Sequence, residues 1–150
     1  MLHLIQSNTD KFYTFLTEDP VRPGIPVDRR IGDNKEIFSL KNEDGSIKAI
    51  TCVSYQDHIP TTEEELFKVQ QEPNLAIFYT IWSYAPGAGR DLILSAVDHI
   101  KNNNPKIKRF ITLSPPTDMA KRFHLKNGAV IFRTNQETVN YEYKVDHSLK

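Results

Sequence analysis

The chain has little cysteine and no excess of either charge, and each absence excludes a class of protein. Cys52 is the single cysteine, so the chain has neither an internal disulfide framework nor a cysteine-rich zinc module. Lysine and arginine together number 19, aspartate and glutamate together also number 19, and the formal net charge is zero. Because phosphate contacts demand a basic excess or a basic patch, we expect no nucleic-acid partner.

Long apolar runs are missing as well. No stretch approaches the ~20 apolar residues that a membrane-spanning helix requires. The segment from Met1 to Asp10 lacks the basic region and the apolar stretch of a secretory signal. We therefore expect a cytoplasmic protein without a membrane partner. The 150 residues, of which 39% are hydrophobic, suffice for one core, so we interpret residues 1–150 as a single domain.

Hydrophobic periodicity and turn signals predict alternating helices and strands. The expected order is a short helix over 11–16, a hairpin of strands 36–40 and 47–55 around Asp44-Gly45, a helix beginning at 63, a strand over 75–82, a helix over 90–103, a strand over 106–113, a short helix over 118–127, and strands over 129–133 and 139–145. Pro20, Pro23 and Pro26 make the segment before the hairpin a loop that crosses one core. A hairpin followed by a strand–helix–strand unit indicates an α/β fold, with a mixed sheet and flanking helices.

A glycine-rich loop follows the strand over 75–82. Backbone N–H groups of Gly87, Ala88, Gly89 and Arg90 would point to the front of a helix whose dipole attracts anions. Glycine also lets a phosphate approach the backbone closely. An ordinary tight turn explains the same two glycines equally well. The loop is not a P-loop, because no Gly-Lys-Ser/Thr follows.

Several segments resemble malonyl-CoA decarboxylase, an enzyme with the fold of the GCN5-related acetyltransferase superfamily. The loop Tyr84-Ala85-Pro86-Gly87-Ala88-Gly89 is similar to the superfamily's coenzyme A motif, Gln/Arg-x-x-Gly-x-Gly/Ala, with tyrosine at its first position. Thr112-Leu113-Ser114-Pro115, Phe123 to Ala129 and Asn140 to Tyr143 resemble three segments of the decarboxylase catalytic domain, in the family's order. The resemblance covers residues 28–145.

This resemblance implies a GCN5-related acetyltransferase-like mixed sheet that binds an acyl-coenzyme A, with malonyl-CoA as the expected ligand. It assigns the coenzyme's pyrophosphate to the loop of Ala85, Pro86, Gly87, Ala88, Gly89 and Arg90. The family's N-terminal helical domain is missing, and its long insertion after the Ser-Pro strand end is replaced by a short connection. We therefore expect a stripped, single-domain version of the decarboxylase catalytic core.

The resemblance further implies that His124 and Ser114 convert malonyl-CoA to acetyl-CoA and carbon dioxide. The ordinary pKa of histidine, near 6.5, lets it accept and donate a proton near neutral pH. Thr112, two residues earlier on the same strand face, is the substitute if Ser114 points away. A backbone N–H near Trp82 or Ser83 could face the thioester oxygen as an oxyanion donor.

Two further residues and two alternative functions stay open. Asn140 and Tyr141 are candidate substrate contacts, although packing on a terminal strand explains them as well. An acyltransferase of the same fold and a non-catalytic coenzyme A-binding module are the alternatives to the decarboxylase. No metal is expected, because the histidines show no ligand spacing with carboxylates or with Cys52. No cofactor beyond the substrate's coenzyme A moiety is expected either.

Overall fold

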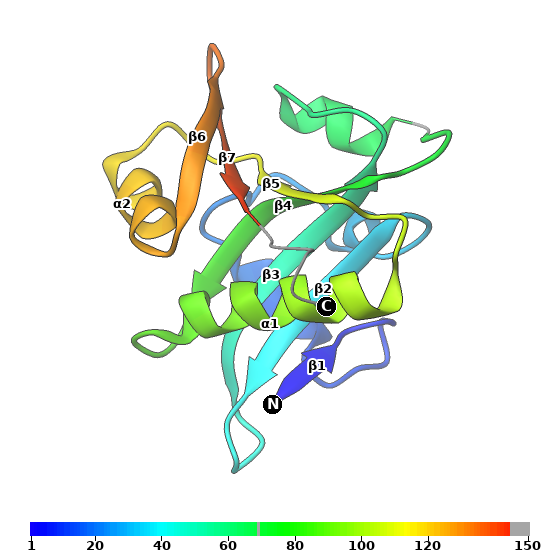
Figure 1. The fold of residues 1–150 in the computed structure, drawn as a ribbon. Coiled ribbons are helices and arrows are strands. Elements are labelled where there is room, and N and C mark those ends of the chain that lie inside the picture. Colours follow the sequence, from blue (N-terminus) through cyan, green and yellow to red (C-terminus); the bar gives the residue numbers. More distant parts are fainter. Residues whose placement is uncertain (69, 145–150) are drawn as a thin grey trace.

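A computed structural model describes residues 1–68 and 70–144 of the chain. Seven strands form one sheet in the order β1-β2-β3-β4-β5-β7-β6 (Figure 1). The strands are β1 Leu2–Leu4, β2 Lys35–Lys41, β3 Ile47–Gln56, β4 Leu75–Ser83, β5 Arg109–Thr112, β6 Ala129–Thr134 and β7 Val139–Tyr143. Neighbouring strands are antiparallel, apart from the parallel pair β4 and β5. The predicted mixed sheet with flanking helices is confirmed.

The helices differ from the prediction mainly in type. Two α-helices, α1 Ala88–Asn103 and α2 Asp118–Lys126, follow β4 and β5, as predicted. The helices expected near the N-terminus and at residue 63 are the short 3-10 helices η1 Tyr13–Glu18 and η3 Glu63–Phe67, and the sequence did not predict η2 Val27–Arg30 or β1. A three-residue strand is too short to show an alternating pattern. The strand predicted over 139–145 ends at Tyr143, and residue 145 lies outside the described residues.

The two faces of the sheet are covered by different parts of the chain. Helix α1 lies across one face (Figure 1) and buries an apolar stripe that includes Leu92, Ile93 and Ala96. The N-terminal segments pack on the other face, where Leu16 and Ile25 are buried against the sheet. Because both faces are covered, the central strand β4 is apolar along almost its whole length.

The two parallel strands, β4 and β5, pair only along the first half of β4. Leu75 to Phe78 pair with Arg109 to Thr112, and the next contact is the Leu113 N–H bond to the Phe78 carbonyl, at 3.1 Å. Beyond this bond β4 and the segment that follows β5 diverge. The register between β3 and β4 shifts at this point, and such a bulge bends a strand and often lies beside a functional site. The divergence creates an opening at the carboxyl ends of two parallel strands, where open α/β sheets bind their ligands.

Candidate functional site

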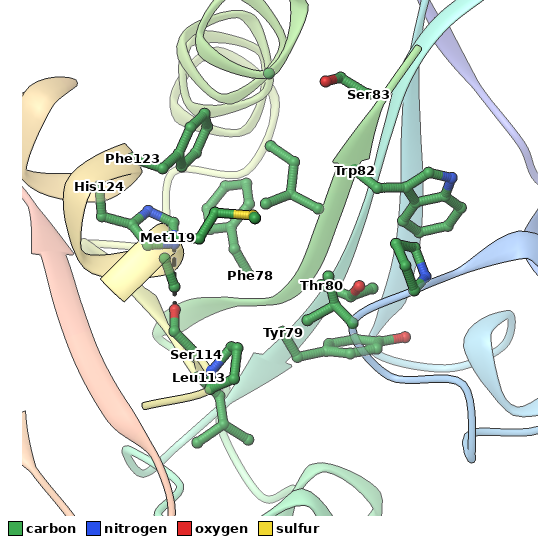
Figure 2. A pocket seen from close by; sticks show the side chains of 16 residues that line it. Phe78, Tyr79, Thr80, Trp82, Ser83, Leu113, Ser114, Met119, Phe123 and His124 are labelled. Carbon is green, nitrogen blue, oxygen red and sulfur yellow. Dashed lines mark hydrogen bonds between the residues drawn. The ribbon is translucent and has the colours of Figure 1, made fainter. Parts of the chain in front are cut away.

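A cavity of about 320 Å³ lies where β4 and β5 diverge (Figure 2). Its walls are formed by strand β4, helix α2, the start of α1, the residues after β5 and the loop after η1. The lining residues are Pro20, Val21, Phe78, Tyr79, Thr80, Ile81, Trp82, Ser83, Gly89, Leu113, Ser114, Pro115, Met119, Ala120, Phe123 and His124. Most of these side chains are apolar, and no carboxylate is among them. The cavity is therefore a place where a bound anion would lose much of its hydration.

Ser114 and His124 meet at one wall of this cavity. Ser114 Oγ lies 3.2 Å from His124 Nε2, and Figure 2 draws this contact as a dashed line between the two side chains. Ser114 is held in place by two backbone hydrogen bonds with Val139, each 2.9 Å long. His124 comes from α2, whose start is capped by the Thr117 side chain. The two residues proposed for catalysis are thus adjacent and face the same space.

The hydrogen-bond network assigns the proton on His124. The Ser114 hydroxyl donates to Thr112 Oγ1 at 2.8 Å, and a hydroxyl has only one proton to donate. The bond between Ser114 and His124 therefore uses a proton on Nε2. A neutral imidazole carries one ring proton, so Nδ1 accepts a hydrogen bond from the Tyr143 hydroxyl, 2.7 Å away. Burial raises the pKa of Tyr143, which keeps that donor proton in place.

Burial changes the acid–base character of His124. His124 is 4% exposed, and its ring stacks on the Tyr141 ring, with centroids 4.9 Å apart. Burial lowers the pKa of His124 from 6.5 to about 4, because the charged imidazolium loses its hydration. The sequence-based expectation of titration near neutral pH is therefore wrong for His124 in this structure. His124 is neutral there at physiological pH.

This lowered pKa makes stability depend on pH. The unfolded chain binds a proton at His124 below about pH 6.5, whereas the folded chain does so only below about pH 4. The free energy of unfolding is therefore highest above pH 6.5, and we expect it to fall by about 3 kcal/mol as the pH drops to 4. Urea unfolding between pH 7 and 4.5 measures this slope. His124→Gln should flatten it, and equal slopes in the two proteins would contradict the shift.

The free edge of β4 presents backbone N–H groups to the cavity. The Tyr84 N–H donates to the Lys48 carbonyl at 2.7 Å, and the register of β4 with β3 is continuous from this point back past Ile81. Backbone groups of alternate residues point to opposite edges of a strand. The Trp82 N–H therefore points toward β3, and the N–H groups of Ile81 and Ser83 point toward the divergence. Trp82 contributes its indole ring to the cavity, and Ile81 is a potential oxyanion donor that the sequence did not predict.

The glycine-rich loop has structural reasons for its glycines. Gly87 precedes α1 with φ of +76°, a left-handed conformation that favours glycine. A Cβ at Gly89 would lie 2.9 Å from Cε1 of Phe123, so this glycine lets the start of α1 pack against α2. Gly89 is also the one loop residue that lines the cavity. The glycines therefore serve packing and chain direction whether or not a phosphate binds there.

The remaining loop residues do not line the cavity. Ala85, Pro86, Gly87, Ala88 and Arg90 are absent from its lining. The Ala88 N–H donates to the Ala85 carbonyl at 3.2 Å, so it is engaged within the loop. The N–H groups of Gly89 and Arg90 belong to the first turn of α1, where backbone donors have no partner inside the helix.

Asn140 and Tyr141, the two predicted substrate contacts on β7, lie outside the cavity lining. The Asn140 amide donates to the carbonyls of Pro60 and Thr112, at 3.0 and 2.8 Å, and accepts from Asn135. Its polar groups are thus engaged in holding the ends of the strands together. The Tyr141 ring stacks on the face of the His124 ring. In this structure both residues support the site instead of facing its cavity.

Two further features of the site were not predicted from the sequence. The Tyr143 hydroxyl hydrogen-bonds the histidine, a contact that the sequence did not predict. Thr112 is not a substitute for Ser114 but its hydrogen-bond acceptor.

In the part of the chain that the structure describes, no group of three or more histidine, cysteine, aspartate or glutamate side chains could hold a metal ion. No helix among residues 1–68 and 70–144 is long and apolar enough to cross a bilayer.

Comparison with known proteins identifies the fold of this chain. The sequence matches no protein-family model and no curated protein. Malonyl-CoA decarboxylase from Agrobacterium vitis superposes with a TM-score of 0.82 and 17% identity, over 97% of this chain and 60% of that chain. Tetrahymena GCN5 superposes with a TM-score of 0.66 and 13% identity, over 98% of this chain and 99% of that chain. The protein has the GCN5-related acetyltransferase fold.

This acetyltransferase fold confirms the predicted fold class and the structural resemblance to malonyl-CoA decarboxylase. It is shared with the PaiA N-acetyltransferase of Thermoplasma acidophilum, solved in complex with coenzyme A, at a TM-score of 0.63 and 13% identity, over 97% of this chain and 99% of that chain. The chain spans 60% of the length of the Agrobacterium decarboxylase. At these identities the likeness extends to the fold alone.

Proposed function

We propose that this chain binds an acyl-coenzyme A at the divergence of β4 and β5 and decarboxylates malonyl-CoA to acetyl-CoA. The observation that carries the proposal is the chain of contacts from Tyr143 through His124 to Ser114, which ends inside an apolar cavity. The decarboxylase fold and the coenzyme A found in a relative of the same fold support it.

The free edge of β4 suits the arm of coenzyme A. Its pantetheine part is an extended chain with two amide groups, which can pair with exposed strand N–H and carbonyl groups as an added strand does. The N–H groups of Ile81 and Ser83 are then donors for the arm or for the thioester oxygen. The pyrophosphate would meet the first turn of α1 at Gly89 and Arg90, where the helix dipole favours an anion.

The reaction proposed for the cavity is the loss of carbon dioxide from malonyl-CoA. The bond between the α-carbon and the carboxylate breaks, its electron pair moves into the thioester as an enolate, and the α-carbon then takes a proton. An apolar lining removes hydration from the carboxylate, and a strand N–H stabilises the enolate oxygen. A bound carboxylate also favours the protonated imidazole. His124 would therefore take up a proton with the substrate and deliver it through the Ser114 hydroxyl.

The acyltransferase alternative lacks a suitable general base. Transfer to an amine is aided by a general base beside the acceptor, and no aspartate or glutamate lines the cavity. His124 is a weak base for this purpose, because burial lowers its pKa to about 4 and its Nδ1 already accepts a hydrogen bond from Tyr143. Incubating the protein with malonyl-CoA and a chelator tests the proposal, with formation of acetyl-CoA expected. If folded protein leaves malonyl-CoA intact but acetylates an amine from acetyl-CoA, it is a transferase. Binding of coenzyme A without either reaction would indicate a non-catalytic module.

Gly87 allows a test of the pyrophosphate site. A Cβ at Gly87 would meet no protein atom within 4 Å, so Gly87→Ala adds a methyl group and backbone strain at the surface where the phosphate would bind. We expect coenzyme A to bind about 10-fold more weakly, because hydrogen bonds to a charged group are lost. Pantetheine, which has no pyrophosphate, should bind as before. Calorimetry measures both affinities.

Gly128→Ala is the matched control for this change. Gly128 also has a left-handed conformation, with φ of +99°, and also has no neighbour within 4 Å of its would-be Cβ. It follows α2, away from the loop before α1. Equal losses of coenzyme A affinity in the two variants would show that the pyrophosphate binds elsewhere.

A further inference from the structure

An arginine outside the sheet connects the two diverging chains. Arg22 lies in the loop after η1, and its guanidinium donates from Nε to the Tyr79 carbonyl at 3.2 Å and from Nη2 to the Leu113 carbonyl at 2.8 Å. Tyr79 belongs to β4 and Leu113 to the chain leaving β5. The last direct backbone bond between them, from Leu113 N–H to the Phe78 carbonyl, lies immediately before. Where the next backbone hydrogen bond between the two strands would lie, the Arg22 side chain bridges the Tyr79 and Leu113 carbonyls instead.

The loop that carries Arg22 is itself held by a buried ion pair. Asp19 and Arg30 contact each other at 2.6 Å, with each side chain 1% exposed. Asp19 Oδ1 accepts from the backbone N–H groups of Val21 and Arg22 and from the Thr80 hydroxyl on β4. Arg30 donates to the Arg22 carbonyl at 2.8 Å. The backbone of Arg22 is therefore tied to β4 and to its own loop before its side chain reaches across.

We infer that Arg22 is a positioning residue that sets the separation between β4 and Ser114. A guanidinium presents its N–H groups in one rigid plane, so bonds to two carbonyls fix the distance between them. On one side of this bridge lie the β4 N–H groups that face the cavity. On the other side, Ser114 directly follows Leu113 and contacts His124. The inference rests on the proposed function for the reaction that this spacing serves.

Removal of Arg22 should affect the chemical step more than binding. In Arg22→Ala we expect kcat for malonyl-CoA to fall by about 10- to 100-fold, since a misplacement of about 1 Å has such a cost. Coenzyme A affinity should stay near that of the unaltered protein. Added guanidinium at millimolar concentration should restore much of kcat by occupying the vacated space, whereas ammonium should not.

Two further variants separate positioning from general stability. Arg22→Lys keeps the charge but not the planar fork, so its kcat should lie between those of Arg22→Ala and the unaltered protein. Arg29→Ala removes an arginine of the neighbouring helix η2, whose guanidinium lies over the Phe67 ring, and it should leave kcat unchanged. An unchanged kcat in folded Arg22→Ala, or equal rescue by ammonium, would overturn the inference.

A second readout does not need the reaction. The ¹⁵N signals of His124, assigned by their loss in His124→Gln, report its tautomer and its bond to Ser114. They should shift in Arg22→Ala and return when guanidinium is added. If the unaltered protein does not decarboxylate malonyl-CoA but the signals behave in this way, the proposed function fails and the spacing role of Arg22 stands. Signals that do not move in Arg22→Ala overturn the spacing role, whatever the activity.

Discussion

His124→Ala should remove most of the decarboxylase activity. General acid–base catalysis by a positioned side chain typically contributes ~10²–10⁴-fold, and His124 is the titratable base that lines the cavity together with a hydroxyl in contact with it. Ser114→Ala should have a loss of similar size, since the hydroxyl is the polar group between the histidine and the ligand space. Steady-state kinetics with malonyl-CoA measure both losses.

The double variant decides whether the two residues act together. Residues that work as a unit are strongly non-additive, so the double variant should be little worse than the worse single variant. Tyr143→Phe removes only the hydroxyl that hydrogen-bonds Nδ1 and should have a smaller loss, as a test of ring orientation. Full turnover in His124→Ala would exclude the proposed mechanism. Additive losses would indicate that His124 and Ser114 perform separate steps.

The sequence could predict most of the sheet because the signals involved are local. Asp44-Gly45 between two apolar runs predicts a hairpin by turn geometry alone, and β2 and β3 flank it as expected. The apolar run of β4 and the amphipathic pattern of α1 have comparable strength. The 3-10 helices η1 and η2 have only six and four residues, too few to show such a period, and Pro20, Pro23 and Pro26 lie between them.

The sequence predicted the pair at the centre of the site but not its electrostatics. Ser114 directly follows Leu113 after β5 and His124 lies ten positions later, near the end of α2; the resemblance to a known family identified both. The lowered pKa of His124 results from burial beneath Tyr141 and Tyr143, and burial depends on how β7 returns beside β5. Long-range contacts of this kind, including those of Arg22, become visible only when the fold is known.

Arg30→Met should be among the most destabilising single substitutions in the chain. Arg30 donates to Asp19 and to the carbonyls of Arg22 and Ile25, at distances of 2.6 to 3.0 Å. Removing one member of a buried ion pair leaves an uncompensated charge and typically costs about 3–5 kcal/mol. We expect a fall of that size in the free energy of unfolding, measured with urea. Arg29→Met, an exposed neighbour, should be nearly neutral.

Neutralising the partner should recover part of this loss. The three donors to Asp19 other than Arg30 all bind its Oδ1, and the side-chain oxygen of an asparagine can replace that Oδ1 as their acceptor. Asp19→Asn combined with Arg30→Met removes the buried charge, so the double variant should be more stable than Arg30→Met alone. If it is less stable, then the damage comes from the lost carbonyl contacts of Arg30 and not from the unpaired carboxylate. A loss of less than about 1 kcal/mol in Arg30→Met would show that water reaches Asp19 and compensates it.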